Sequence, residues 1–129
     1  MNPDTRDEIV ARLADYQSAV EIGIGNRPDV AGALADAGTD VTATDIRPRK
    51  VPTDVRFVLD DVTNPDSTLY QDTDLLYALN IPPELHRSAL LVAKEYDSAF
   101  VFTTLGGDQP SVPVRRETIS GETLFWARE

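Results

Sequence analysis

Short runs of apolar residues recur along the chain, and polar residues, glycine or proline separate each run from the next. Such runs are too brief for a helix and are typical of strands that are buried on both faces of a parallel sheet. We therefore predict strands at residues 18–24, 41–45, 55–59, 74–79 and 99–103.

Other segments place their apolar residues at helical spacing, on one face. Helices are predicted at residues 4–15, 28–37 and 84–96. Pro28 suits the first turn of the second helix, because the amide hydrogen that proline lacks would be unpaired there, and Gly38 is suited to end that helix. Residues 47–54 form a polar connector with two prolines, and residues 64–66 indicate a turn or the start of a short helix.

The last part of the chain has a different pattern. Residues 114–119 and 123–127 read as two strands around Ser120-Gly121-Glu122, which predicts an antiparallel hairpin. The earlier strands alternate with helices, which predicts a mostly parallel sheet with helices on both faces. We therefore expect one α/β domain over residues 1–129, a three-layer α/β/α Rossmann-like sheet that closes with the C-terminal antiparallel hairpin.

The junction between the first strand and the second helix carries Gly23 and Gly25. Glycine allows a sharp turn at this point and lets a ligand come close to the main chain. Asp45 ends the second strand, 20 positions after Gly25. This spacing is typical of a carboxylate that binds the hydroxyls of a ribose. The sequence therefore predicts a nucleotide-type pocket.

Two ligand classes use such a pocket, namely dinucleotides such as NAD and S-adenosylmethionine. Dinucleotide folds place a third glycine where this chain has Pro28, and the pyrophosphate lies on the helix N-terminus. The proline ring removes a donor and adds bulk at that position. Glu21, just before the first glycine, is unfavourable for a diphosphate but suits a cationic sulfonium and α-amino group. The residues favour S-adenosylmethionine over NAD.

Four motifs of the chain resemble those of the S-adenosylmethionine-dependent methyltransferases. They are the acid-and-glycine pattern of residues 21–25, the acid Asp45, the segment Asp60-Asp61-Val62 after the third strand, and Asn80-Ile81-Pro82-Pro83 after the fourth. The last is similar to the Asn-Pro-Pro-aromatic signature of amino-group methyltransferases, but Ile81 is inserted and Glu84 replaces the aromatic residue. The final hairpin also resembles the antiparallel strands that close the sheet in that family. In its length, the chain looks most like small archaeal proteins of an uncharacterised family with a shortened methyltransferase-like fold.

The resemblance implies that S-adenosylmethionine is the cofactor, with Asp45 at the ribose and Asp61 at the adenine. The candidate cofactor-binding residues are Glu21, Gly23, Gly25, Asn26, Asp45, Ile46, Asp61, Val62 and Asn80. No catalytic residue is identified, because methyl transfer requires little from a protein beyond the alignment of nucleophile, methyl group and sulfur.

Ordinary structural roles compete with these assignments. Asn80 precedes a helix and is more typical of a helix cap than of a catalytic residue. Glu21 could form an ion pair with Arg27, and Asp60 fits a solvated acidic surface. Tyr77 lies inside a predicted central strand and is expected in the core.

Composition limits the choice of functions. The formal net charge is −10, with 22 acidic and 12 basic residues, so the surface repels a phosphate backbone and no nucleic-acid binding is expected. An Asp-rich, Lys-poor surface resembles that of salt-adapted proteins, and we expect a halophilic archaeal source. The chain has no Cys and a single His, His86, which is expected to pack or to lie at the surface, so we predict no metal site.

No stretch is apolar enough to cross a membrane, and the first residues lack the features of a signal peptide, so we expect a cytoplasmic protein. Three functions stay open. The first is an S-adenosylmethionine-binding domain with minimal methyltransferase activity. The second is a degenerate, non-catalytic nucleoside-binding or interaction module, and the third is an NAD-binding domain. The expected partner is a small-molecule ligand, and a homodimer or a protein partner that completes the site is left open.

Overall fold

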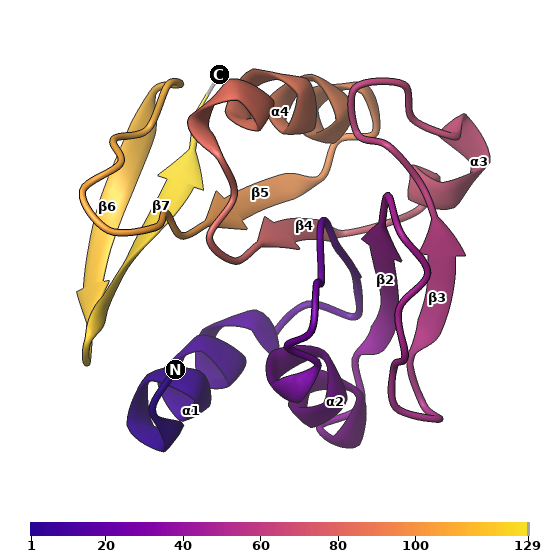
Figure 1. The fold of residues 1–129 in the computed structure, drawn as a ribbon, viewed down its shortest axis with the longest axis horizontal. Helices are drawn as coiled ribbons and strands as arrows, with labels where there is room; N and C mark the ends of the chain where they lie inside the picture. The colour runs from indigo at the N-terminus through magenta and orange to yellow at the C-terminus, as the bar shows by residue number, and fades with distance from the viewer. Residues whose placement is uncertain (129) are drawn as a thin grey trace.

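A computed structural model describes residues 1–128 and shows a seven-stranded sheet in the order β3-β2-β1-β4-β5-β7-β6 (Figure 1). The strands are β1 Ser18–Glu21, β2 Asp40–Asp45, β3 Arg56–Leu59, β4 Leu75–Ala78, β5 Ala99–Phe102, β6 Val114–Ile119 and β7 Glu122–Ala127. The first five pair in parallel, and β7 joins β5 and β6 in antiparallel fashion. The predicted parallel sheet with a closing hairpin is confirmed.

Helices cover both faces of the sheet. The helical segments are α1 Pro3–Leu13, α2 Asp29–Asp36, α3 Ser67–Tyr70, η1 Pro83–Leu85 and α4 His86–Glu95. Figure 1 shows α1 and α2 on one side of the sheet and α3 and α4 on the other. Because successive side chains of a strand point to opposite faces, β4 sends Leu75 and Tyr77 to the core beneath α1 and α2, and Leu76 and Ala78 to the core beneath α4. This is the predicted three-layer α/β/α arrangement.

The strand before the glycines is shorter than predicted, since β1 ends at Glu21 rather than at Ile24. Ile22 still donates a backbone hydrogen bond to the Tyr77 carbonyl at 2.8 Å. Gly23 then takes a φ of +70°, which turns the chain out of the ladder. The glycine that was expected to make the turn therefore also ends the strand.

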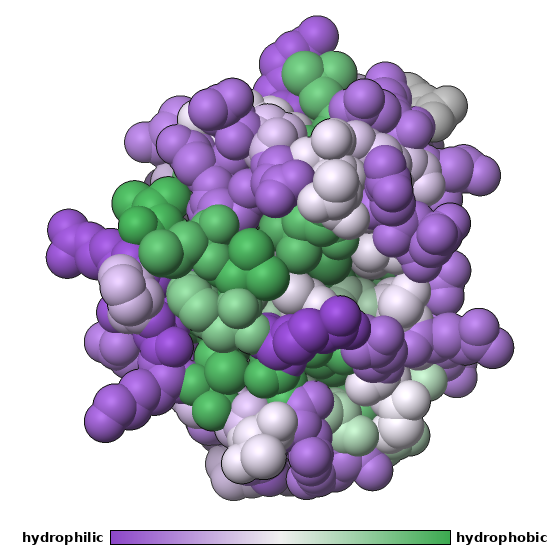
Figure 2. Space-filling model, turned by 90° about the vertical axis from the view of Figure 1, so that its right-hand side faces the viewer, coloured by the Kyte–Doolittle hydropathy of each residue, from purple (hydrophilic) through white to green (hydrophobic). Residues whose placement is uncertain are grey.

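The sheet has one thinly covered edge. In the described residues, the connection from β2 to β3 contains no helix, and α3 before β4 has only 4 residues. Edge strand β3 consequently keeps Leu59 56% exposed, and Ile46, just after β2, is 71% exposed. Figure 2, which views this side of the molecule, shows apolar side chains gathered over the middle of it.

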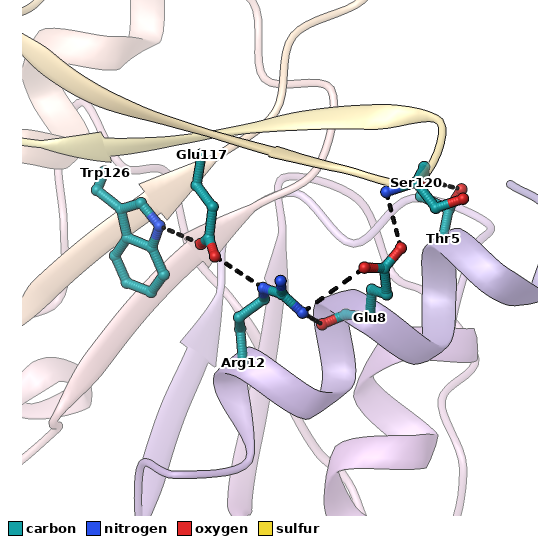
Figure 3. A network of polar contacts seen from close by, with 6 residues as sticks. All are labelled: Thr5, Glu8, Arg12, Glu117, Ser120 and Trp126. Carbon is teal, nitrogen blue, oxygen red and sulfur yellow. Dashed lines mark hydrogen bonds and ion pairs between the residues drawn. The ribbon is translucent and has the colours of Figure 1, made fainter.

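Polar contacts fasten α1 to the hairpin (Figure 3). Glu117 on β6 accepts hydrogen bonds from Arg12 Nε at 2.9 Å and from Trp126 Nε1 at 3.1 Å. At the hairpin turn, the Ser120 amide donates to Glu8 Oε2 at 2.7 Å, and its carbonyl accepts from Thr5 Oγ1 at 2.6 Å. The first helix and the last strands are thereby held as one unit beside the carboxyl ends of the parallel strands.

Gly121 in the hairpin turn provides a test of this fastening. Its φ is +75°, and a Cβ added there would lie 2.7 Å from Thr5 Oγ1. Gly121→Ala is expected to lower the free energy of unfolding by about 1–3 kcal/mol, since it combines left-handed strain with a clash. The matched control is Gly107→Ala, because a Cβ at Gly107 meets no atom within 4 Å. Denaturant unfolding measures both variants, and equal stabilities would contradict the prediction.

Candidate ligand-binding cavity

A cavity of about 310 Å³ opens at the carboxyl ends of β1 and β4. It is lined by Glu21, Gly23, Ile24, Gly25, Asn26, Arg27, Leu79, Asn80 and Leu105. We call it the glycine-loop cavity. The chain runs outward from β1 in both directions along the sheet, to β2 and to β4, so this is the topological switch point where open α/β sheets bind ligands. A cavity of similar volume lies over Ser18, Asp40 and Arg56, at the beginnings of the strands, where such sheets do not hold their ligands.

The glycine turn is open to a ligand. Gly23 and Gly25 have φ values of +70° and +60°, and a Cβ added to either would meet no atom within 4 Å. Because the space around both positions would admit a side chain, it is the positive φ values that favour glycine there. The turn is therefore not filled by neighbouring side chains, and its main chain can be reached from the cavity.

Asp45 holds the turn from beneath. Its side chain faces inward, the residue is 7% exposed, and Oδ2 accepts a hydrogen bond from the Gly25 amide at 2.8 Å. Oδ1 accepts from the Arg47 amide at 3.1 Å, and Arg49 Nε lies 3.3 Å from Oδ2. Burial acts to raise the pKa of Asp45, but the two amides and the charge of Arg49 outweigh it, so the pKa lies below its ordinary value. The carboxylate stays charged at neutral pH and keeps acceptor capacity on Oδ1.

Arg49 bridges two of the candidate residues. Besides its ion pair with Asp45, its Nη1 donates a hydrogen bond to Asn26 Oδ1 at 2.8 Å. The connector between β2 and β3 thus places the Arg49 guanidinium over Asp45 and Asn26. The sequence identified this connector only as polar. A ribose that binds Asp45 would have to displace this side chain.

Glu21 is buried in the wall of the glycine-loop cavity, at 1% exposure. Among the described residues, neither its Oε1 nor the hydroxyl of Tyr77 has a hydrogen-bond partner. Burial raises the pKa of Glu21 to about 8, and the facing Tyr77 hydroxyl offsets only part of this effect. The ion pair between Glu21 and Arg27, the alternative to a ligand contact, does not form in the described structure.

Asn80 adopts a left-handed backbone with φ of +57°, which is uncommon for a residue other than glycine. With its amide oriented to match its neighbours, its oxygen accepts from Arg27 Nη1 at 2.7 Å and its nitrogen donates to the Thr104 carbonyl at 3.1 Å. The cap residues of η1 and α4 are Pro82 and Leu85, and neither makes a side-chain cap bond. The prediction that Asn80 caps a helix is therefore wrong, and the residue instead joins the glycine loop to the end of β5.

The remaining candidates lie apart from the cavity or at its edge. Ile46 follows Asp45 with an exposed apolar side chain. Asp61 is exposed, and it accepts hydrogen bonds from the Thr63 amide at 2.9 Å and hydroxyl at 2.7 Å. These hydrogen bonds lower the pKa of Asp61. Val62 is buried in the core beneath α4. Neither Asp61 nor Val62 lines the glycine-loop cavity.

Two residues near the site have structural roles. Asp60 accepts hydrogen bonds from the Tyr70 hydroxyl at 2.7 Å and from the Asp66 amide at 2.8 Å, so it anchors α3 rather than only coating the surface. His86 is fully buried against Phe102. Its Nε2 donates to the Ile81 carbonyl at 3.1 Å, and its Nδ1 accepts from the Ser111 amide at 3.1 Å. Of the two roles expected for His86, packing is therefore the one the structure shows.

Sequence reasoning missed several residues of the site. Arg27, Leu79 and Leu105 line the cavity, and Arg49 covers Asp45. Leu105 is 64% exposed at the rim. Its position in the loop after β5 was the available signal, because loops at the carboxyl ends of parallel strands border ligand sites. The contacts of the arginines had no comparable signal.

Within residues 1–128, no group of three or more His, Cys, Asp or Glu side chains is placed to hold a metal ion. The helices of the same residues are too short or too polar to cross a bilayer.

The sheet order and the closing antiparallel hairpin define a Rossmann-like fold of the methyltransferase type. A profile of the "Uncharacterised protein family (UPF0146)" matches residues 5–129, and the chain belongs to this family. A UPF0146 protein of Halobacterium salinarum is 50% identical over 122 residues, which cover 94% of this chain and 95% of that protein. One of Archaeoglobus fulgidus is 37% identical, over 75% of this chain and 79% of that protein.

Methyltransferases are among the solved structures with this fold. An RNA methyltransferase from Salinibacter ruber, in complex with S-adenosylhomocysteine, aligns with a TM-score of 0.69 and 17% identity over 98% of this chain and 92% of its own. A magnesium protoporphyrin IX methyltransferase from Synechocystis with bound S-adenosylmethionine aligns with a TM-score of 0.66 and 14% identity, over 95% of this chain and 76% of its own. At these identities the likeness establishes the fold.

Proposed function

We propose that the glycine-loop cavity binds S-adenosylmethionine, and that the protein transfers its methyl group to an acceptor in the adjoining space. The observation that carries this proposal is the joint placement of an open glycine turn, a charged Asp45 beneath it and an unpartnered Glu21 in one wall. A nucleoside with a cationic tail matches these three features. Structural neighbours that bind S-adenosylmethionine or S-adenosylhomocysteine support the same ligand class.

Each part of the ligand has a counterpart in the chain. Asp45 takes the ribose hydroxyls through its two carboxylate oxygens, once Arg49 has moved away from Oδ2. Ile46, exposed beside Asp45, provides an apolar surface for the adenine. Arg27, which has no ion-pair partner among the described residues, faces the ligand carboxylate, and Glu21 faces its amino group.

Space for an acceptor adjoins the glycine-loop cavity. A second cavity of about 310 Å³ shares Arg27, Asn80 and Leu105 with it and extends to Thr5 and the hairpin turn. Methyl transfer needs chiefly alignment of the reacting atoms, so an acceptor that is already nucleophilic can react without a base. This second cavity is the reason to propose transfer rather than binding alone.

One observation favours a non-catalytic nucleoside-binding module as the second candidate. Both ends of the Asn80 amide are occupied, by Arg27 and by the Thr104 carbonyl. The residue at the position of the family's fourth motif therefore has less capacity to hold an acceptor. A dinucleotide oxidoreductase is disfavoured, because Pro28 precedes α2 without a side-chain cap bond and supplies no amide hydrogen to a phosphate.

A melting experiment in high salt tests which class of ligand the cavity binds. The ligands are S-adenosylmethionine, S-adenosylhomocysteine, adenosine and NAD, each at about 100 times its dissociation constant where one is measurable. Such an excess adds about 2.7 kcal/mol of stability, which raises Tm by on the order of 10 °C for a domain of this size. We expect the shift with the two S-adenosyl compounds. A shift with NAD alone would make the protein a dinucleotide binder, and no shift with any ligand would reduce the site to a scaffold.

A further inference from the structure

Glu21 and Tyr77 lie side by side on neighbouring strands, because β1 and β4 pair in parallel with Glu21 opposite Tyr77. Residues in this register point to the same face of the sheet. Glu21 is 1% exposed and Tyr77 is 0% exposed. Each ends in a polar atom without a hydrogen-bond partner among the described residues, namely Oε1 and the hydroxyl oxygen. Glu21 lines the glycine-loop cavity, whereas Tyr77 lies in the core beside it, so a ligand in the cavity can supply the partner that the Glu21 carboxyl lacks.

Among the described residues, no cationic side chain forms an ion pair with the Glu21 carboxylate. The core on this face contributes apolar side chains from α1 and α2, such as Ile9 and Val30. On β2, the Asp45 carboxylate is directed to the Gly25 amide and to Arg49. In the glycine loop, the Arg27 guanidinium is bonded to Asn80. An isolated buried carboxylate is costly, so the group takes up a proton instead.

We infer that Glu21 and Tyr77 form a cation subsite that exchanges a proton for the amino group of the ligand. The inference rests on the proposed function, since the amino group is that of an S-adenosyl ligand. In the empty cavity, the Glu21 carboxyl is protonated. When the ligand ammonium reaches it, the carboxyl proton passes to solvent and an ion pair with the ammonium takes its place. Tyr77 is a positioning residue, whose hydroxyl donates towards the carboxylate and stabilises its charged form.

The consequence is a pH-dependent affinity with a defined direction. Burial places the pKa of Glu21 at about 8 in the empty cavity, so only a minor fraction of the protein is ready to bind a cation at pH 7. The apparent affinity scales with that fraction and therefore rises about tenfold per pH unit below pH 7. A nucleoside ligand without an amino group shows no such rise. Specificity for amino-bearing ligands consequently weakens in acid.

Calorimetric titration tests the inference with two probes. S-adenosylhomocysteine carries the amino group, and 5′-methylthioadenosine has the same nucleoside and sulfur without the amino-acid part. Binding enthalpies at pH 7 in phosphate and in Tris, whose ionisation enthalpies differ, give the number of protons released. We expect about one proton for S-adenosylhomocysteine and none for 5′-methylthioadenosine, together with the tenfold rise in affinity per unit between about pH 5.5 and about pH 7, where the α-amino group stays largely protonated.

Matched variants distinguish the effect of the Glu21 charge from a general effect on the fold. Glu21→Gln is expected to abolish proton release while the affinity for 5′-methylthioadenosine stays unchanged. Tyr77→Phe removes a group that lowers the pKa of Glu21, so its affinity for S-adenosylhomocysteine at pH 7 falls several-fold and its pH profile moves to higher pH. Tyr70→Phe is the control, since Tyr70 is also fully buried but donates to Asp60 in another part of the molecule. Its profile should match that of the unmodified chain.

The outcomes distinguish this inference from the function on which it rests. Absence of binding by both probes would overturn the proposed function. Binding of both probes without proton release, or with the same release for both, would overturn the proton exchange and leave the nucleoside site standing. An unchanged pH profile in Tyr77→Phe would remove Tyr77 from the subsite.

Discussion

Replacing Asp45 by Asn is expected to weaken the binding of S-adenosylhomocysteine by at least about 100-fold. Two hydrogen bonds from the ribose hydroxyls to a charged acceptor contribute about 1.5 kcal/mol each or more, and 1.4 kcal/mol is a factor of ten in affinity. An amide retains the shape of the side chain but loses the charge, which two backbone amides and Arg49 stabilise against the effect of burial. Calorimetric titration in high salt measures the change.

Asp45 also supports the glycine turn, so a loss of binding alone would be ambiguous. Arg49→Gln provides the matched control, because it removes the ion pair to Asp45 while leaving the carboxylate in place. If Asp45 binds the ribose, Arg49→Gln frees it and raises the affinity for S-adenosylhomocysteine by a few-fold, in the opposite direction to Asp45→Asn. The melting temperature of each variant without ligand measures how far the substitution destabilises the fold. Equal losses of affinity in both variants would assign Asp45 a purely structural role.

The sheet could be predicted from the sequence because its signals are local. Each buried strand is a short apolar run between polar residues, and the hairpin has Gly121 at its turn. The predicted end of β1 was wrong. The apolar residues continue to Ile24, but hydropathy does not record that Gly23 turns the chain away at a φ of +70°. Backbone conformation, rather than burial, decided that boundary.

The site could be predicted only in part. The glycine turn and Asp45 were found because their spacing reflects the geometry of one strand-helix-strand unit. Arg49 could not be found, because a long side chain can reach many places and the sequence does not show which. Asn80 was assigned to a helix cap by its place before two prolines. The structure instead gives it a left-handed backbone, and its side chain bonds Arg27 and the Thr104 carbonyl across the sheet.

The proximity of Glu21 and Tyr77 could also be predicted only in part. Both residues were visible, and a parallel sheet with β1 beside β4 puts them on the same face. The register that sets them opposite one another depends on tertiary packing and could not be read from the chain. Without that register, Glu21 was assigned either to a ligand or to Arg27, and Tyr77 only to the core.

Glu21 should make the stability of the unliganded protein fall as pH rises from about 5 to about 8. The folded-state pKa, about 8, is raised above the ordinary value of 4.5, so the folded protein binds more protons than the unfolded chain between these two values. The contribution of Glu21 is therefore fully present below the ordinary pKa and is lost as pH rises through the folded one. The loss is roughly 1 kcal/mol per pH unit, or several kcal/mol over the window.

Denaturant unfolding of the unmodified chain and of Glu21→Gln at several pH values measures this effect. The variant keeps a neutral side chain at all pH values, so it should match the unmodified chain near pH 5 and exceed it near pH 8. Asp45, Asp61 and Glu117 have lowered pKa values, so their contributions are lost only as pH falls through those depressed values, below this window. The difference between the two proteins also cancels contributions that the substitution leaves unchanged. A difference that stays constant with pH would show that the Glu21 carboxyl is ionised in the folded protein, and the cavity would then need a cation that the described chain does not supply.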